Sequence, residues 1–104
     1  MTSSTINELV AYAQSVRVSD DTLTIELADG RALSVPLAWF PRLLAGTQAE
    51  RDKWRLIGTG SGIHWSELDE DISVASLLAG RASGESQRSL QHWLTQRAAS
   101  TPQP

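Results

Sequence analysis

The chain has 104 residues, a length that fits one small domain and excludes two full-sized ones. Its formal net charge of −3 lacks the cationic footprint of a dedicated nucleic-acid binder, so a nucleic-acid partner is not expected. The absence of cysteine excludes a disulfide scaffold, a thiolate zinc site and a cysteine nucleophile. No apolar run approaches the ~20 residues of a membrane span, and the first residues lack a signal-peptide pattern. We therefore expect a cytoplasmic protein without a membrane partner.

The first half of the chain predicts a three-stranded antiparallel meander. Apolar and polar residues alternate in 16–18, 22–27 and 31–35, which gives each strand one apolar and one polar face. Asp29-Gly30 between the second and third strands is typical of a tight hairpin turn. The preceding segment 5–14 leaves a helix, a first strand and a partly ordered arm open, because its apolar residues follow helical spacing but its caps are weak.

Short helices are predicted to cover this meander. Residues 37–44 are apolar but broken by Pro41, which favours a single helical turn across the open sheet face. Thr47-x-x-Glu50 has the spacing of a capping box and predicts a charged helix over 48–54, whose basic residues would face solvent. Ser73 is a natural cap for a second helix over 74–79.

The segment between these helices predicts two brief strands. Residues 55–58 and 63–65 flank a glycine-rich loop that reads as a hairpin turn or bulge, because no lysine follows it as a phosphate-binding loop requires. The acidic run 67–71 is expected to be a loop leading into the next helix.

These elements define the predicted fold class and domain organisation. The fold is α+β, a small antiparallel β-meander packed by two or three short helices, with a C-terminal helical extension. Residues 1–81 form the domain, and 82–104 form a short amphipathic helix and a disordered tail. In the helix, expected within 86–98, the apolar stripe consists of Leu90, Trp93 and Leu94.

A series of motifs in the centre of the chain resembles one bacterial family. The motifs are Phe40-Pro41-Arg42-Leu43, Trp54-Arg55-Leu56-Ile57-Gly58, Gly62-Ile63-His64-Trp65 and Leu68-Asp69-Glu70-Asp71-Ile72-Ser73-Val74. Together they are similar to the domain-of-unknown-function 2442 family over about residues 14–81. The resemblance implies a small α+β domain, sometimes followed by a helix-turn-helix domain, and a place in two-gene operons that resemble toxin–antitoxin pairs. It implies no activity, and residues 81–104 are too few for a helix-turn-helix domain.

One cluster of polar residues is a candidate metal-binding or acid–base site. His64, Glu67, Asp69 and Asp71 offer the residue types of a metal site or an acid–base pair. The second histidine lies in a distal segment, and the acidic run lacks the central glycine of a calcium loop. A structural role is therefore favoured, with Asp69 or Asp71 capping the next helix or bonding the glycine loop. No catalytic, cofactor-binding or metal-binding residue is assigned.

The aromatic residues give the second candidate site. Trp39, Phe40, Trp54 and Trp65 are expected to fill the core, with a binding groove as the alternative. Trp93 lies outside the family-like segment, and its helix could dock on its own domain, on a second copy or on another protein. The predicted partner-binding residues are Leu90, Trp93, Leu94, Trp39 and Phe40.

The sequence thus favours a non-enzymatic protein-interaction or accessory domain. Its partner would be another protein, such as the product of a neighbouring gene bound in an antitoxin-like way, or a second copy of the chain. One alternative is a metal- or small-molecule-dependent enzyme that uses the cluster around His64. A second alternative is a transcriptional regulator, which the net charge opposes.

Overall fold

The structure is a computed structural model, and it describes residues 12–100. The predicted meander is confirmed as an antiparallel sheet of β1 (Ala13–Val18), β2 (Thr22–Leu27) and β3 (Ala32–Pro36). The register places Ile25 opposite both Val16 and Leu33, so the apolar residues of all three strands share one face. Most of the segment 5–14 lies outside the described residues, and its last two residues belong to β1.

A second three-stranded antiparallel sheet follows, which the sequence indicated only in part. It contains β4 (Trp54–Ile57), β5 (Gly62–Trp65) and β6 (Glu70–Ser73), in that order. The expected loop over 67–71 is wrong from residue 70 onward, because Asp71 pairs with His64 and Ile72 pairs with Ile63 across the ladder. Asp69 closes the intervening turn at a φ of 52°, a left-handed conformation that aspartate tolerates better than most residues.

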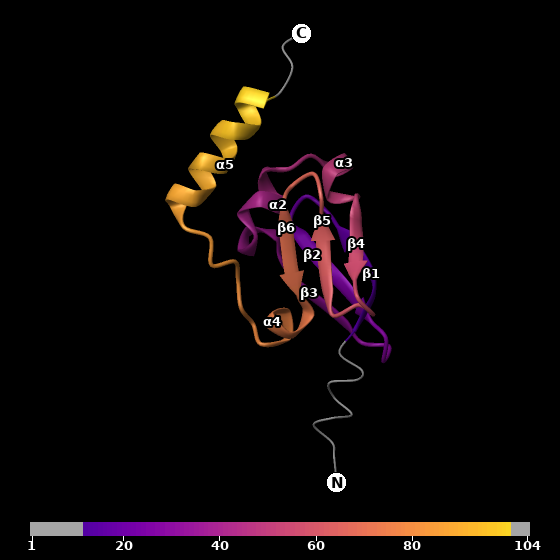
Figure 1. The fold of residues 1–104 in the computed structure, drawn as a ribbon. Helices are drawn as coiled ribbons and strands as arrows, with labels where there is room; N and C mark the ends of the chain where they lie inside the picture. The colour runs from indigo at the N-terminus through magenta and orange to yellow at the C-terminus, as the bar shows by residue number, and fades with distance from the viewer. Residues whose placement is uncertain (1–11, 101–104) are drawn as a thin grey trace.

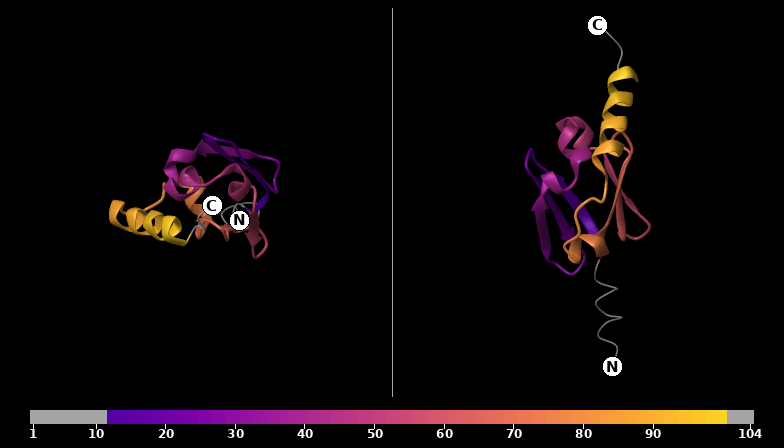
Figure 2. Two further views of the ribbon diagram at one scale, coloured as in Figure 1. Left: turned by 90° about the horizontal axis from the view of Figure 1, so that it is seen from above. Right: turned by 90° about the vertical axis from the view of Figure 1, so that its left-hand side faces the viewer.

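The two sheets form two layers with short helices at both ends of the interlayer space (Figures 1 and 2). At one end lie the 3₁₀ helix η1 (Leu37–Trp39), α2 (Pro41–Ala45) and α3 (Gln48–Arg51). At the other end lies α4 (Val74–Leu78). The long helix α5 (Gln87–Ser100) lies beside the end that carries α2. None of the helices within residues 12–100 is long and apolar enough to cross a bilayer.

The predicted helix caps are present, although one helix is shorter than expected. Thr47 Oγ1 accepts from the Glu50 amide at 3.1 Å, and the Glu50 carboxylate accepts from the Thr47 amide at 2.9 Å. Ser73 caps α4 by accepting from the Ser76 amide. Helix α3 ends at Arg51, and Trp54 is the first residue of β4 instead of the last of a helix, because it pairs with Trp65.

The core lies between the sheets and includes side chains from both of them. Trp65 is completely buried, and its indole N–H donates to the Arg51 carbonyl at 2.9 Å. Arg51 is buried as well, with Nε donating to the Leu43 carbonyl at 2.8 Å and Nη2 to the Leu44 carbonyl at 2.9 Å. The expectation that the basic residues of this helix face solvent is therefore wrong for Arg51, which satisfies carbonyls at the end of α2.

A close backbone approach joins the two sheets at the β4–β5 turn. The Ala13 amide donates to the Gly60 carbonyl at 2.8 Å. A Cβ on Gly60 would lie 2.2 Å from the Ala13 carbonyl oxygen, and the Gly60 φ is 108°. Only glycine fits at this position, which explains part of the glycine-rich loop without a ligand.

Candidate functional site

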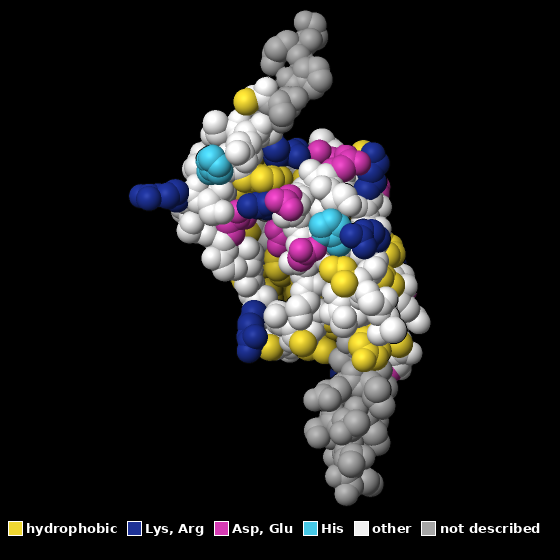
Figure 3. Space-filling model, viewed as in Figure 1, with side chains coloured by type: hydrophobic (Ala, Val, Ile, Leu, Met, Phe, Trp, Pro, Cys, Tyr) yellow, Lys and Arg dark blue, Asp and Glu magenta, His cyan; other side chains and the backbone are white. Residues whose placement is uncertain are grey.

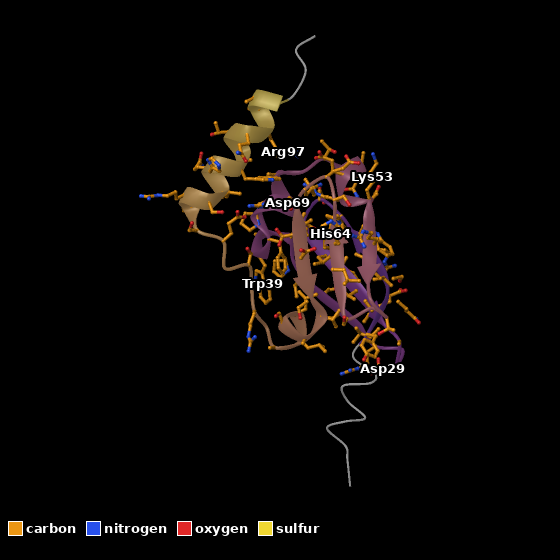
Figure 4. The ribbon with its side chains drawn as sticks, in the orientation of Figure 1. Asp29, Trp39, Lys53, His64, Asp69 and Arg97 are labelled. Atoms are coloured by element: carbon orange, nitrogen blue, oxygen red, sulfur yellow. The ribbon has the colours of Figure 1, made fainter. Side chains whose placement is uncertain are left out.

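The structure brings together only two members of the polar cluster predicted around His64. His64 Nδ1 contacts the Asp71 carboxylate across the β5–β6 ladder, on the outer face of the second sheet. The Glu67 carboxylate pairs instead with Lys53 Nζ at 2.9 Å, and Asp69 pairs with Arg42 at 3.3 Å. Figure 4 shows His64 on the sheet and Asp69 displaced toward α5.

This distribution argues against a shared chemical centre. Glu67 and Asp69 each neutralise a cation on another element, and Asp71 is 68% exposed. Among residues 12–100 there is no group of three or more His, Asp or Glu side chains that could hold a metal ion. The expected helix cap from Asp69 or Asp71 is also wrong, because Ser73 takes that position and Asp71 is committed to His64.

A cluster of charged side chains around Trp93 fastens α5 to the domain. The guanidinium carbons of Arg42 and Arg97 lie 4.9 and 4.8 Å from the centroid of the Trp93 ring, within cation–π range. We call these three residues the Trp93 clamp. The ring itself is 8% exposed, although it belongs to a helix at the margin of the molecule. The sequence left three docking surfaces open for this helix. In the structure α5 docks on the chain's own domain.

Two carboxylates hold the arginines of the clamp in place. Arg42 makes a forked pair with Glu85, in which Nη2 donates to Oε2 at 2.6 Å, and it also donates to the Asp69 carbonyl. Arg97 makes a forked pair with Glu50, with N–O distances of 3.0 and 3.1 Å. These hydrogen bonds lower the pKa of both Glu85 and Glu50 and raise the pKa of Arg42, which favours the charged form of these three groups.

A groove runs beside β6 on the side away from β5. It has a volume of about 300 Å³ and is bounded by all four residues of β6 and by the connecting segment 81–84. Phe40 and Ser76 complete its lining, and Figure 3 shows the surface hollowed between this segment and the sheet, with apolar side chains at the bottom. The volume falls at the lower end of the range for binding pockets.

One carboxyl in this groove has unusual electrostatics. Glu70 pairs with Trp65 in the ladder, so its side chain lies on the inward face of the strand and is half-buried. Burial is the main cause that raises the pKa of Glu70 to about 7; Arg42 opposes the shift, and the Glu85, Asp71 and Asp69 carboxylates add to it. The group therefore exchanges its proton near neutral pH.

The predicted partner-binding residues lie at two places. Leu90, Trp93 and Leu94 pack on the chain's own core, and Trp93 is buried there. Phe40 is 4% exposed and lines the groove, while Trp39 is half-buried beside it along the chain. Neither Trp93 nor Phe40 presents a free aromatic surface in this conformation.

Sequence reasoning missed the residues that give the groove and the clamp their chemistry. Glu70 lay within a run read as a loop, although the alternation of 70–73 places it on the same strand face as Ile72. Arg42 and Glu85 are separated by 43 positions, and Arg97 and Glu50 by 47. No local pattern signals such pairs. The capping box identified Glu50 as a helix-capping residue, but it did not identify Glu50 as the partner of Arg97.

Comparisons with known proteins agree with this geometry at the level of the fold. A family model described as "Protein of unknown function (DUF2442)" matches residues 13–83. The crystal structure of a protein of unknown function from Rhodospirillum rubrum is 24% identical and superimposes with a TM-score of 0.63, covering 71% of this chain and 92% of that one. The solution structure of an uncharacterised protein from Chromobacterium violaceum is 20% identical with a TM-score of 0.63, covering 94% of this chain and 86% of that one. No curated protein matches the chain.

Proposed function

The chain belongs to the DUF2442 family of proteins of unknown function, and we propose that it is a non-enzymatic protein-interaction domain that binds its partner at the groove beside β6. The partner is a second protein, and the product of a neighbouring gene, bound in an antitoxin-like way, is the first candidate. This proposal keeps the function expected from the sequence and transfers the binding site from the Trp93 stripe to the groove lined by Phe40.

The groove is the single observation that carries the proposal. It is about 300 Å³ in volume, and its lining combines a strand edge, an aromatic floor and polar rim residues. Such a mixture of apolar and hydrogen-bonding surface is typical of sites that bind polypeptide. The stripe of α5, in contrast, is already covered by the chain itself.

The two alternative functions rest on weaker support. A metal-dependent enzyme would need His64 and the three carboxylates to converge, and two of the carboxylates pair with Lys53 and Arg42 instead. Titration with divalent cations before and after His64→Ala would detect such a site calorimetrically. A transcriptional regulator would need a basic face, which the net charge of −3 opposes. A gel shift at low salt would detect DNA binding.

Co-purification with the product of the adjacent gene tests the proposal. Gly84→Trp is the informative variant, because Gly84 lines the groove and a Cβ there meets no atom within 4 Å, so the backbone tolerates a side chain and a bulky indole at this wall should obstruct the groove. Ala28→Trp is the control, since Ala28 is exposed in the β2–β3 turn of the other sheet. We expect a complex at micromolar concentration for the wild type and Ala28→Trp, and none for Gly84→Trp. Absence of the complex in all three, or its persistence in Gly84→Trp, contradicts the proposal.

A further inference from the structure

The strand β6 forms the edge of its sheet. β5 pairs with it on one side, and in the described part of the chain no strand pairs with it on the other. That free edge is one wall of the groove, since all four residues of β6 line it. An edge strand presents a row of unpaired backbone N–H and C=O groups, which is a template for a further strand.

The opposite wall of the groove is held away from β6 by contacts of its own. The Ser83 amide donates to the Trp39 carbonyl at 2.9 Å, which ties the connecting segment to η1. Glu85 is then held by the forked pair with Arg42, and both side chains are largely buried, at 9% and 16% exposed. The segment thus faces β6 without pairing with it. Because the groove is already formed without a ligand, binding requires less loss of conformational entropy.

The length of the groove suits a short extended segment. The four residues of β6 extend over ~13 Å at ~3.3 Å per residue. A strand added along this edge would make main-chain hydrogen bonds with β6 and direct alternate side chains toward Phe40 and Ile72 at the bottom of the groove.

The charged residues that line the groove favour a cationic side chain in the bound segment. Glu70 and Asp71 line it from β6, and Arg81 lines it from the opposite wall. Arg42, whose charge acts on Glu70, directs its hydrogen bonds to Glu85 and Asp69. Within residues 12–100, Glu70 has no ion-pair partner, so an incoming cation would find an inward-facing carboxyl free to bind it.

We propose that an extended polypeptide segment adds to the free edge of β6 as a fourth strand and places a Lys or Arg side chain against Glu70. This inference rests on the proposed function, and it specifies the conformation of the partner segment and the charge of its central side chain. The ion pair is partly shielded from water by the groove, where it gains more than it would on an open surface.

The proposal has a proton-linked consequence. The charged groups that act on Glu70 are Arg42, Glu85, Asp69 and Asp71, and Arg81 lines the opposite wall of the groove. With a pKa of about 7, the free Glu70 carboxyl is ionised in roughly a tenth of molecules at pH 6 and in roughly nine tenths at pH 8. A bound cation requires the ionised form. Affinity should therefore rise about tenfold over this interval, with release of a proton on binding at the lower pH.

Matched pools of synthetic hexapeptides test this inference on the full chain. The pools carry Val and Thr at flanking positions and differ only at one central position, which is Lys, norleucine or Glu. Amide shifts of Asp71, Ser73, Ser83 and Gly84 are followed by NMR at pH 6 and pH 8. We expect the Lys pool to move these amides and to bind at least ~10-fold more tightly than the norleucine pool at pH 8. The Glu70→Gln variant should bind both pools equally and lose the pH dependence.

The outcomes separate this inference from the proposed function. Equal binding of the Lys and norleucine pools by the wild type overturns the assignment of Glu70, and the failure of every pool to move the groove amides overturns strand addition. Neither result tests whether the chain forms a complex with the neighbouring gene product, because the Gly84→Trp experiment tests that complex independently. Persistence of the Lys preference in Glu70→Gln would assign the selectivity to another residue and refute the pairing.

Discussion

Removal of the Trp93 side chain should release α5 from the domain. In Trp93→Ala, the cation–π contacts with Arg42 and Arg97 are lost together with the burial of the ring. The other apolar residues of the stripe, Leu90 and Leu94, are only half-buried and cannot replace it. The forked pair between Arg97 and Glu50 remains, but it does not replace the apolar burial that the Trp93 ring supplies.

The magnitude follows from the exposure of the ring. Trp93 is 8% exposed, so nearly all of its side-chain surface is removed from water. Truncation of a buried Trp to Ala costs about 3–5 kcal/mol, of which the cation–π contact with Arg42, the one that joins α5 to α2, contributes ~0.5–1 kcal/mol. An isolated helix of this length is marginal in water. We therefore expect the free energy that holds α5 to fall by about 3–5 kcal/mol, enough to populate a detached and frayed helix.

Native-state hydrogen exchange measures this effect element by element. A loss of about 3 kcal/mol corresponds to a ~100-fold decrease in protection of the α5 amides, whereas amides of β2 should change less than tenfold. His92→Ala is the matched control, because His92 is the neighbouring residue on the same helix and is exposed. Unchanged protection of α5 in Trp93→Ala, or an equal loss in both variants, would refute the role of the clamp.

Three further variants test other parts of the argument. Because burial raises the pKa of Glu70 to about 7, stability that is present below pH ~4.5 is lost as the pH rises through 7. Glu70→Gln should therefore raise the free energy of unfolding by about 1–2 kcal/mol at pH 8, after discounting for partial exposure, and leave it unchanged at pH 4. Gly60→Ala should cost about 2–4 kcal/mol in urea unfolding, because its Cβ meets the Ala13 carbonyl, whereas Gly84→Ala should stay within ~0.5 kcal/mol. Arg51→Met removes the guanidinium donor to the Leu44 carbonyl and leaves the Leu43 carbonyl with only the Gly46 amide, so it should lower the thermal midpoint by an amount equivalent to about 1–3 kcal/mol. An Arg51→Met midpoint equal to that of the wild type would show that these hydrogen bonds are dispensable.

The elements that sequence predicted correctly are those with local causes. The alternation in β1, β2 and β3 and the turn at Asp29-Gly30 each depend on residues close together in the chain, and the structure confirms them. The same holds for the caps at Thr47 and Ser73, where donor and acceptor are three positions apart.

The second sheet was predicted only in part because β6 depends on its partner strand. Its four residues include two acidic ones, a composition depleted in strands. In the pairing with β5, Asp71 lies opposite His64 and Ile72 lies opposite Ile63. These cross-strand contacts compensate for the weak intrinsic strand propensity of β6. The left-handed Asp69 that closes this hairpin likewise has no unique sequence signal.

The sequence by itself determined the α+β class, the first sheet and the apolar stripe of α5 on which Trp93 lies. Only the tertiary structure decided where that stripe docks and where the groove lies. The ion pairs that hold Arg42 and Arg97 against Trp93 join residues more than forty positions apart. The groove exists because Ser83 and Glu85 are tied to η1 and α2, and thereby face the edge of β6. Contacts between distant segments leave no periodic pattern in the local sequence, so only the folded structure identifies them.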